Sequence, residues 1–101
     1  MSENLLNLVN IIRDRKNKGK GKSYTSSLLS GGLSKCIDKM EEEFDELKEA
    51  LNNKSNIVHE AADTIYHILV TLEAADIKFE DVLKELEDRK KQSGIEKKNN
   101  R

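Results

Sequence analysis

Apolar residues recur every three or four positions along most of this 101-residue chain, and no proline interrupts them. This spacing lines apolar side chains along one face of a helix, whereas a strand requires strict alternation, which we find nowhere at useful length. The pattern therefore predicts an all-α fold. It places four helices: one near residues 3–16, one capped at Ser34 and ended by Asn52 and Asn53, one capped at Ser55 and broken near Asp76, and one ended by Ser93 and Gly94.

The two middle helices differ in how much of their surface is apolar. The helix from Ser55 is apolar around more than half its circumference, so we expect it to be the central one. Residues 17–32 contain four glycines and read as a loop, with a short apolar turn at Leu28 and Leu29. We expect in the core the apolar face of the helix from Ser34, namely Ile37, Met40, Phe44, Leu47 and Leu51.

The chain is short enough to form one domain with a small core. It has two tyrosines, two phenylalanines and no tryptophan. A lone domain of this size leaves much of its surface in water, so association with a second copy is favourable. We expect one domain over residues 1–92, a disordered basic tail over 93–101, and a homodimer or higher homo-oligomer.

Several protein classes are disfavoured by what the chain lacks. A single cysteine, Cys36, allows neither an internal disulfide framework nor a cysteine-based zinc site. No stretch approaches the roughly 18 consecutive apolar residues of a membrane span, and the first residues do not resemble a secretory signal. We therefore expect a cytoplasmic protein with no membrane partner.

The formal net charge of −1 hides a strong segregation of charge along the chain. Residues 1–39 carry 8 basic and 3 acidic side chains, residues 40–88 carry 4 basic and 15 acidic, and residues 89–101 carry 6 basic and 1 acidic. An acidic centre would repel a phosphate backbone, and the basic ends lack interleaved aromatic residues, so we expect no nucleic-acid partner. The acidic centre is either a solvated helix face or a cation site.

The spacing of four carboxylates favours the cation site. Glu43 and Glu46 are three residues apart in one predicted helix, and Glu60 and Asp63 are three apart in the next. The short connection between these helices favours antiparallel packing, in which the two pairs can face each other. Acidic pairs at this spacing are also common on solvated faces, but Glu60 and Asp63 lie in an apolar segment, where an unpaired carboxylate is costly. Four such oxygen ligands suit Mg²⁺ or Mn²⁺.

Three longer segments resemble a known family. The motif Glu43-x-x-Glu46, thirteen residues, then Glu60-x-x-Asp63 is similar to the metal motif of the all-α MazG-like nucleotide pyrophosphohydrolases. SYTSSLL at 23–29, EAADTIYHILV at 60–70 and KMEEEFDE at 39–46 are similar to segments of the phosphoribosyl-ATP pyrophosphohydrolase family within that superfamily. The resemblance covers about residues 5–89.

This resemblance implies an activity and a set of site residues. The activity is Mg²⁺-dependent hydrolysis of phosphoribosyl-ATP to phosphoribosyl-AMP and pyrophosphate, the second step of histidine biosynthesis. The implied metal ligands are Glu43, Glu46, Glu60 and Asp63. The implied catalytic residues are Glu42, Glu43 and Glu46, with Glu42 orienting or deprotonating the attacking water. The expected substrate-binding residues are Lys22, Ser23, Thr25, Lys39 and His67.

The role of His67 has two interpretations. It is one turn beyond Asp63, so it could either hydrogen-bond that carboxylate or contact the substrate.

Two other functions remain beside the hydrolysis of phosphoribosyl-ATP. A MazG-like enzyme acting on another nucleoside triphosphate would share the carboxylates but not the SYTSSLL segment. A non-enzymatic helical module that binds a partner helix would not bind metal.

Overall fold

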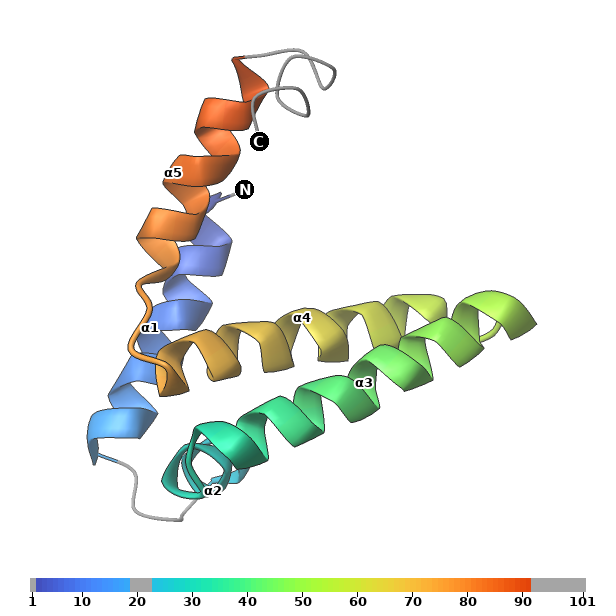
Figure 1. Ribbon diagram of the computed structural model, residues 1–101, viewed down its shortest axis with the longest axis horizontal. Helices are drawn as coiled ribbons and strands as arrows, with labels where there is room; N and C mark the ends of the chain where they lie inside the picture. Colours follow the sequence, from blue (N-terminus) through green and yellow to red (C-terminus); the bar gives the residue numbers. More distant parts are fainter. Residues whose placement is uncertain (1, 19–22, 92–101) are drawn as a thin grey trace.

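The computed structural model describes residues 2–18 and 23–91, which form five helices and, over those residues, no strand (Figure 1). The prediction of an all-α fold is confirmed. Lys22 and the predicted basic tail at 93–101 lie outside the described residues. The helices are α1 (Ser2–Lys18), α2 (Tyr24–Ser30), α3 (Leu33–Asn53), α4 (Ile57–Ala74) and α5 (Phe79–Lys90).

The short helix α2 lies where we expected a loop with one apolar turn. Ser23 caps it, since its side-chain oxygen accepts a hydrogen bond from the backbone N–H of Ser26 at 3.1 Å. Thr25, Ser26 and Leu28 are buried against the rest of the protein. A helix of seven residues is stabilised by its cap and by tertiary packing more than by propensity, so periodicity did not indicate it.

The starts of α3 and α4 also differ from the prediction. The residue preceding α3 is Gly32, with φ of 90°, and the residue preceding α4 is Asn56, with φ of 62°. Neither helix begins with a side-chain cap, so the predicted caps at Ser34 and Ser55 are wrong. Gly32 takes a left-handed conformation that suits glycine, and this sharp turn starts α3 directly after α2.

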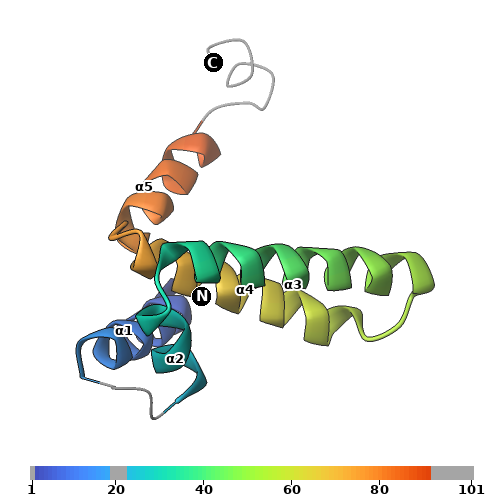
Figure 2. The same ribbon diagram turned by 60° about the horizontal axis from the view of Figure 1, so that its bottom comes forward.

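The helices are arranged as a long hairpin with a cluster of helices at one end. Helices α3 and α4 run antiparallel and side by side in both views (Figures 1 and 2). Helices α1, α2 and α5 gather where α3 begins and α4 ends (Figure 1). The molecule measures 45 × 34 × 25 Å. Among the described helices, none is long and apolar enough to cross a membrane.

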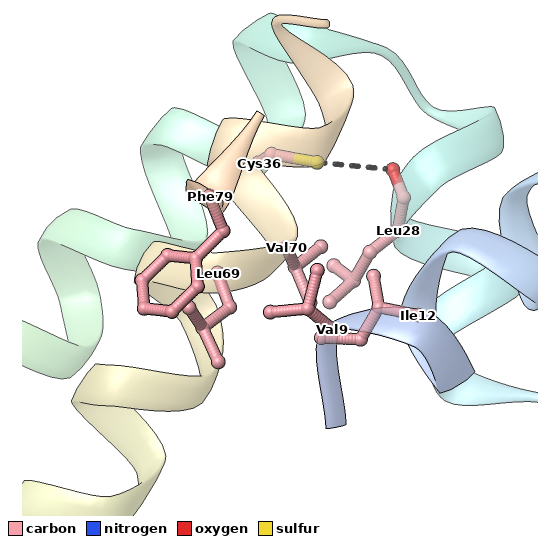
Figure 3. Close-up of a cluster of buried hydrophobic side chains, with 7 residues drawn as sticks. All are labelled: Val9, Ile12, Leu28, Cys36, Leu69, Val70 and Phe79. Atoms are coloured by element: carbon pink, nitrogen blue, oxygen red, sulfur yellow. Dashed lines mark hydrogen bonds between the residues drawn. The ribbon is translucent and has the colours of Figure 1, made fainter. Parts of the chain in front are cut away.

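The hydrophobic core lies at this clustered end, and every helix contributes to it (Figure 3). Helix α4 supplies its centre, as expected from its apolar circumference. The thiol of Cys36 is buried there and donates to the backbone oxygen of Leu28 at 3.4 Å. The buried cluster consists of Val9, Ile12, Leu28, Cys36, Leu69, Val70 and Phe79.

The predicted apolar face of α3 is not a core face within this single chain. Ile37, Phe44 and Leu51 are exposed, while Met40 and Leu47 are half-buried. The prediction that these five residues form the core is therefore wrong for Ile37, Phe44 and Leu51. The physical reason is that, over the described residues, α3 packs chiefly against α4 along its other side, which leaves these three side chains uncovered.

Ion pairs tie α1 to the turn between α4 and α5. Arg13 contacts Glu73 at 3.0 Å and Glu80 at 2.6 Å. Lys16 contacts the carboxylate of Asp76 at 2.6 Å and the backbone oxygen of Glu73 at 2.6 Å. The Arg13 guanidinium lowers the pKa of Glu80 to about 2 through their hydrogen bonds. These contacts fix α1 and the start of α5 relative to the end of α4.

Candidate metal and nucleotide site

The register between α3 and α4 is set by two buried threonines on α4. The hydroxyl of Thr64 lies 3.1 Å from the backbone oxygen of Glu43 and 2.8 Å from that of Glu60. Two turns further along α4, the hydroxyl of Thr71 lies 3.2 Å from the backbone oxygen of Cys36. Each hydroxyl therefore donates a hydrogen bond to a backbone oxygen of α3. The bond from Thr64 holds the turn carrying Glu43 against the turn carrying Glu60.

Three carboxylates converge at that level. Glu43, Glu60 and Asp63, which we call the acidic triad, each offer a carboxylate oxygen, and these oxygens lie within 4.8 Å of one another. Glu43 is 8% exposed, and the other two are partly buried. Like charges at this range disfavour simultaneous ionisation unless a cation lies among them.

Two observations indicate that a divalent cation fits the triad. Burial, followed by the negative charge of Glu46, raises the pKa of Glu43, while His67 lowers it. The Oε1 atom of Glu60 is buried and has no hydrogen-bond partner among the described residues. An ionised carboxylate oxygen only accepts, so it requires a donor or a metal ion. Oxygen ligands at this spacing suit Mg²⁺ or Mn²⁺.

Glu46, the fourth predicted ligand, lies outside the 4.8 Å cluster. It is exposed on α3, one turn beyond Glu43. Together with Glu60 it lines an open pocket of about 210 Å³ at the hairpin end of the site, which also includes Glu49 and Asn53. Its role as a metal ligand stays a prediction.

Glu42 and Lys39 lie at the edge of the triad. Both are on α3, and the ammonium of Lys39 lies 3.4 Å from a carboxylate oxygen of Glu42. The pKa of Lys39 is raised by Tyr24, by Glu42 and, less, by Glu43. Glu42 is exposed and is not one of the three converging carboxylates. The predicted roles of Glu42 with water and of Lys39 with phosphate stay predictions.

Two residues of SYTSSLL that we expected to contact substrate, Ser23 and Thr25, make hydrogen bonds within the protein. Ser23 caps α2 and its hydroxyl lies 3.0 Å from the hydroxyl of Ser26. Thr25 is almost completely buried, and its hydroxyl is hydrogen-bonded to that of Tyr66. Lys22 lies outside the described residues. Neither hydroxyl reaches the acidic triad, and their part in substrate binding stays a prediction.

His59, rather than His67, lies beside the carboxylate of Asp63. The Nδ1 atom of His67 lies 2.8 Å from the backbone oxygen of Asp63, not from its carboxylate. The exposed His59 pairs with that carboxylate instead, at 3.3 Å. Side chains of a helix lean toward its N-terminus, so Asp63 leans toward His59, and His67 reaches only the backbone of Asp63.

Two functional residues were missed from the sequence. The hydroxyl of Tyr24 lies 3.0 Å from Nε2 of His67, and Thr64 sets the helix register. The signal for Thr64 was a polar residue inside the apolar segment of α4, next to Asp63. The signal for Tyr24 was its place in SYTSSLL, but the partner of its hydroxyl is 43 residues away.

The fold and the site define a class of protein: an all-helical protein with three converging carboxylates between two antiparallel helices. The sequence profile of the phosphoribosyl-ATP pyrophosphohydrolase family matches residues 5–90. The chain therefore belongs to the phosphoribosyl-ATP pyrophosphohydrolase family, as the resemblance predicted.

Curated relatives match over nearly the full chain. The phosphoribosyl-ATP pyrophosphatase of Rhizobium etli is 39% identical over 99 residues, which cover 96% of this chain and 92% of the relative. The same-named protein of Roseobacter denitrificans is 42% identical over 92 residues, covering 89% and 88%. That of Clostridium novyi is 39% identical over 92 residues, covering 89% and 84%.

Proposed function

We propose that this chain hydrolyses phosphoribosyl-ATP to phosphoribosyl-AMP and pyrophosphate, the second step of histidine biosynthesis, in the cytoplasm and with Mg²⁺. Membership of the family and the names of the relatives support the reaction. The observation that carries the metal dependence is the acidic triad with its unpartnered Glu60 oxygen. Mn²⁺ is the alternative cation, because it takes the same oxygen ligands.

The triad would hold the cation, and Glu46 would join it from the next turn of α3. A divalent cation bound there would offset phosphate charge and make a bound water more acidic. In the reaction, a water oxygen attacks a phosphorus atom and the bond to the bridging oxygen breaks, so pyrophosphate leaves with that oxygen. The proton of the attacking water goes to a carboxylate.

Glu42 is the best base for that proton. Its side chain is exposed on α3 and pairs with Lys39 across 3.4 Å, so it can turn toward a bound water. Lys39 would then be free to neutralise a phosphate. Its raised pKa keeps the ammonium charged at neutral pH.

We also propose that the hairpin packs against a second copy of the chain. Ile37, Phe44 and Leu51 are exposed at seven-residue intervals on α3, and Val58 and Ile65 are exposed seven residues apart on α4. This interval places each set along one face of its helix, as in helix bundles that pack side by side. Such apolar stripes are costly in water, which supports a homodimer or higher homo-oligomer.

The activity is tested with purified protein, phosphoribosyl-ATP and a panel of dNTPs, each with and without MgCl₂. We expect pyrophosphate release from phosphoribosyl-ATP only when Mg²⁺ is present. Faster release from a dNTP would make the chain an enzyme for another nucleotide. If no nucleotide is turned over and the protein does not bind Mg²⁺, it is a helical interaction module.

A further inference from the structure

The ring of His67 has both of its nitrogens engaged. Its Nδ1 lies 2.8 Å from the backbone oxygen of Asp63, and its Nε2 lies 3.0 Å from the hydroxyl of Tyr24. A carbonyl oxygen only accepts, so Nδ1 carries a proton, and in the neutral form of the ring this is the only one. Nε2 is then an acceptor, which makes the Tyr24 hydroxyl the donor. With 5% of its surface exposed, His67 has no free face to offer a substrate.

Tyr24 is the exposed member of this pair. It is the first residue of α2, whose start is fixed by the Ser23 cap and whose next residue, Thr25, is buried. The side chain is thus held at its backbone by α2 and at its hydroxyl by His67, yet 54% of the residue is exposed. An aromatic ring that is already fixed loses little conformational freedom when a ligand binds to it.

The Tyr24 side chain is linked to the acidic triad through His67. The Tyr24 hydroxyl lies 3.0 Å from Nε2 of His67, and Nδ1 of the same ring lies 2.8 Å from the backbone oxygen of Asp63. Partial burial raises the pKa of Tyr24, and the neighbouring carboxylates raise it further against the opposing effect of Lys39. The side chain therefore stays a neutral phenol at neutral pH. A nucleotide with its phosphates at the triad would have its sugar and base within reach of this ring.

The chemistry of Tyr24 limits what it can contact. Its one hydroxyl proton is donated to His67, and phosphate oxygens only accept, so Tyr24 cannot serve as a phosphate donor while that bond is kept. What remains available is the exposed face of the ring. Aromatic faces of this kind stack on nucleobases, and the interaction depends on the ring rather than on the hydroxyl.

We propose that the exposed ring of Tyr24 is the platform on which the adenine base of the substrate stacks, and that His67 is the positioning residue that holds the ring in place. This inference rests on the proposed hydrolysis of a nucleotide at the same site. It gives the site a means of distinguishing a nucleotide from pyrophosphate or another small phosphate compound, because only the nucleotide presents a base to the ring.

The first test is a comparison of Tyr24→Leu, Tyr24→Phe and Tyr66→Phe in steady-state kinetics with phosphoribosyl-ATP and MgCl₂. Tyr66 is the matched control, because its ring also meets His67 at a centroid distance of 5.8 Å but its hydroxyl binds Thr25. We expect Tyr24→Leu to raise KM by about 10-fold or more with kcat within about threefold of wild type. Tyr24→Phe keeps the ring but loses the bond to His67, so it should raise KM less than Tyr24→Leu does, and Tyr66→Phe should change KM by less than about threefold.

Binding measurements separate the base from the phosphates. Calorimetric titration with AMP and, separately, with pyrophosphate is done in MgCl₂ on the wild type and on Tyr24→Leu. We expect Tyr24→Leu to weaken AMP binding by about 10-fold and to leave pyrophosphate binding unchanged. An equal loss for both ligands, an unchanged KM in Tyr24→Leu, or an equal effect of Tyr24→Phe and Tyr24→Leu would each overturn the stacking role.

The positioning role of His67 is tested by a double-mutant cycle. His67→Leu should raise KM in the wild-type background and have little further effect in the Tyr24→Leu background, because its effect passes through the ring. Equal effects in both backgrounds would show a role of His67 independent of Tyr24 and overturn the pairing. A wild-type protein that releases no pyrophosphate from phosphoribosyl-ATP would contradict the proposed function, whereas the AMP titration still decides the role of Tyr24.

Discussion

The hydroxyl of Thr64 lies 3.1 Å from the backbone oxygen of Glu43, and this contact between α4 and α3 is at the level of the acidic triad. Thr64 is next to Asp63 in sequence, so the same turn of α4 carries both a carboxylate of the acidic triad and the contact that positions it. Thr71 makes the corresponding contact with the backbone of Cys36, seven residues along the same helix. The hairpin is thus fixed at two levels, only one of which carries the site.

Thr64→Val should weaken Mg²⁺ binding as well as the fold. The valine keeps the shape but removes the hydrogen bond from α4 to the backbone oxygen of Glu43, which costs about 0.5–1.5 kcal/mol of the free energy of unfolding. Thr71→Val is the control, since it should lower stability by a similar amount without changing Mg²⁺ affinity. Chemical denaturation and metal titration measure the two effects. Equal loss of Mg²⁺ affinity in both variants would show that Thr64 has no special place in the site.

Asp63→Asn and Glu46→Gln should each abolish Mg²⁺-dependent pyrophosphate release while helix content, followed by circular dichroism, is kept. Loss of a ligand charge reduces both cation affinity and charge compensation, and we expect a rate loss of about 100-fold or more. Glu41→Gln removes an exposed carboxylate from the same stretch of α3 and should leave the rate within about twofold. Retained turnover in both site variants would contradict the assignment of the site.

Mg²⁺ should stabilise the protein more at pH 7 than at pH 5. The pKa of Glu43 is raised by burial and by Glu46, so the folded protein binds its proton more tightly than the unfolded chain. Without metal, this group makes stability fall as pH rises from the unfolded pKa through the folded pKa. A cation removes that cost only where Glu43 is ionised. Thermal denaturation with and without MgCl₂ at both pH values tests this, and an equal shift in Tm would contradict it.

Glu80→Gln should reduce stability near pH 7 and flatten its dependence on pH in acid. The pKa of Glu80 is about 2 in the folded protein, below its usual 4.5. A lowered pKa contributes stability that is present above the unfolded value and is lost as pH falls through the folded value. Glu87→Gln, in an exposed pair with Lys90, is the control with a smaller expected effect. Thermal melts between pH 2 and 5 measure the difference, because this range spans the folded pKa of Glu80 and its usual pKa of 4.5.

Leu51→Glu should convert the oligomer into monomers. A charge in the middle of a buried apolar interface is costly, while Leu51 is already exposed within one chain, so the monomer itself should fold normally. Leu86→Glu, at an equally exposed apolar position on α5, should not change the mass. Light scattering at micromolar concentration gives the mass of each variant. A monomeric wild type would contradict the proposed assembly.

Much of the fold was predictable because helices have a fixed period. The repeat of apolar residues located α1, α3, α4 and α5 to within a few residues, and it placed Glu43 and Glu60 on the sides of neighbouring helices. What periodicity missed was α2, which is too short to show a repeat and depends on the Ser23 cap and on burial. The helix starts at Gly32 and Asn56 were also missed, because backbone turns rather than capping side chains define them.

Much of the site was predictable for a similar reason. Three of the four predicted ligands converge, since i and i+3 residues of a helix lie on one side. The sequence could not show that Glu46 lies outside the cluster, that His59 rather than His67 pairs with the Asp63 carboxylate, or that Tyr24 meets His67. Each depends on the relative height of two segments or on the direction of a side chain.

The sequence by itself therefore determined the helical class, the family and the angular position of each carboxylate around its own helix axis. Only the tertiary structure decided which turns of α3 and α4 lie at the same height, and so which carboxylates share a site. The reason is physical: a residue's angle follows from local backbone geometry, whereas the height of one helix against another is set by contacts such as Thr64 with Glu43, between residues far apart in the chain.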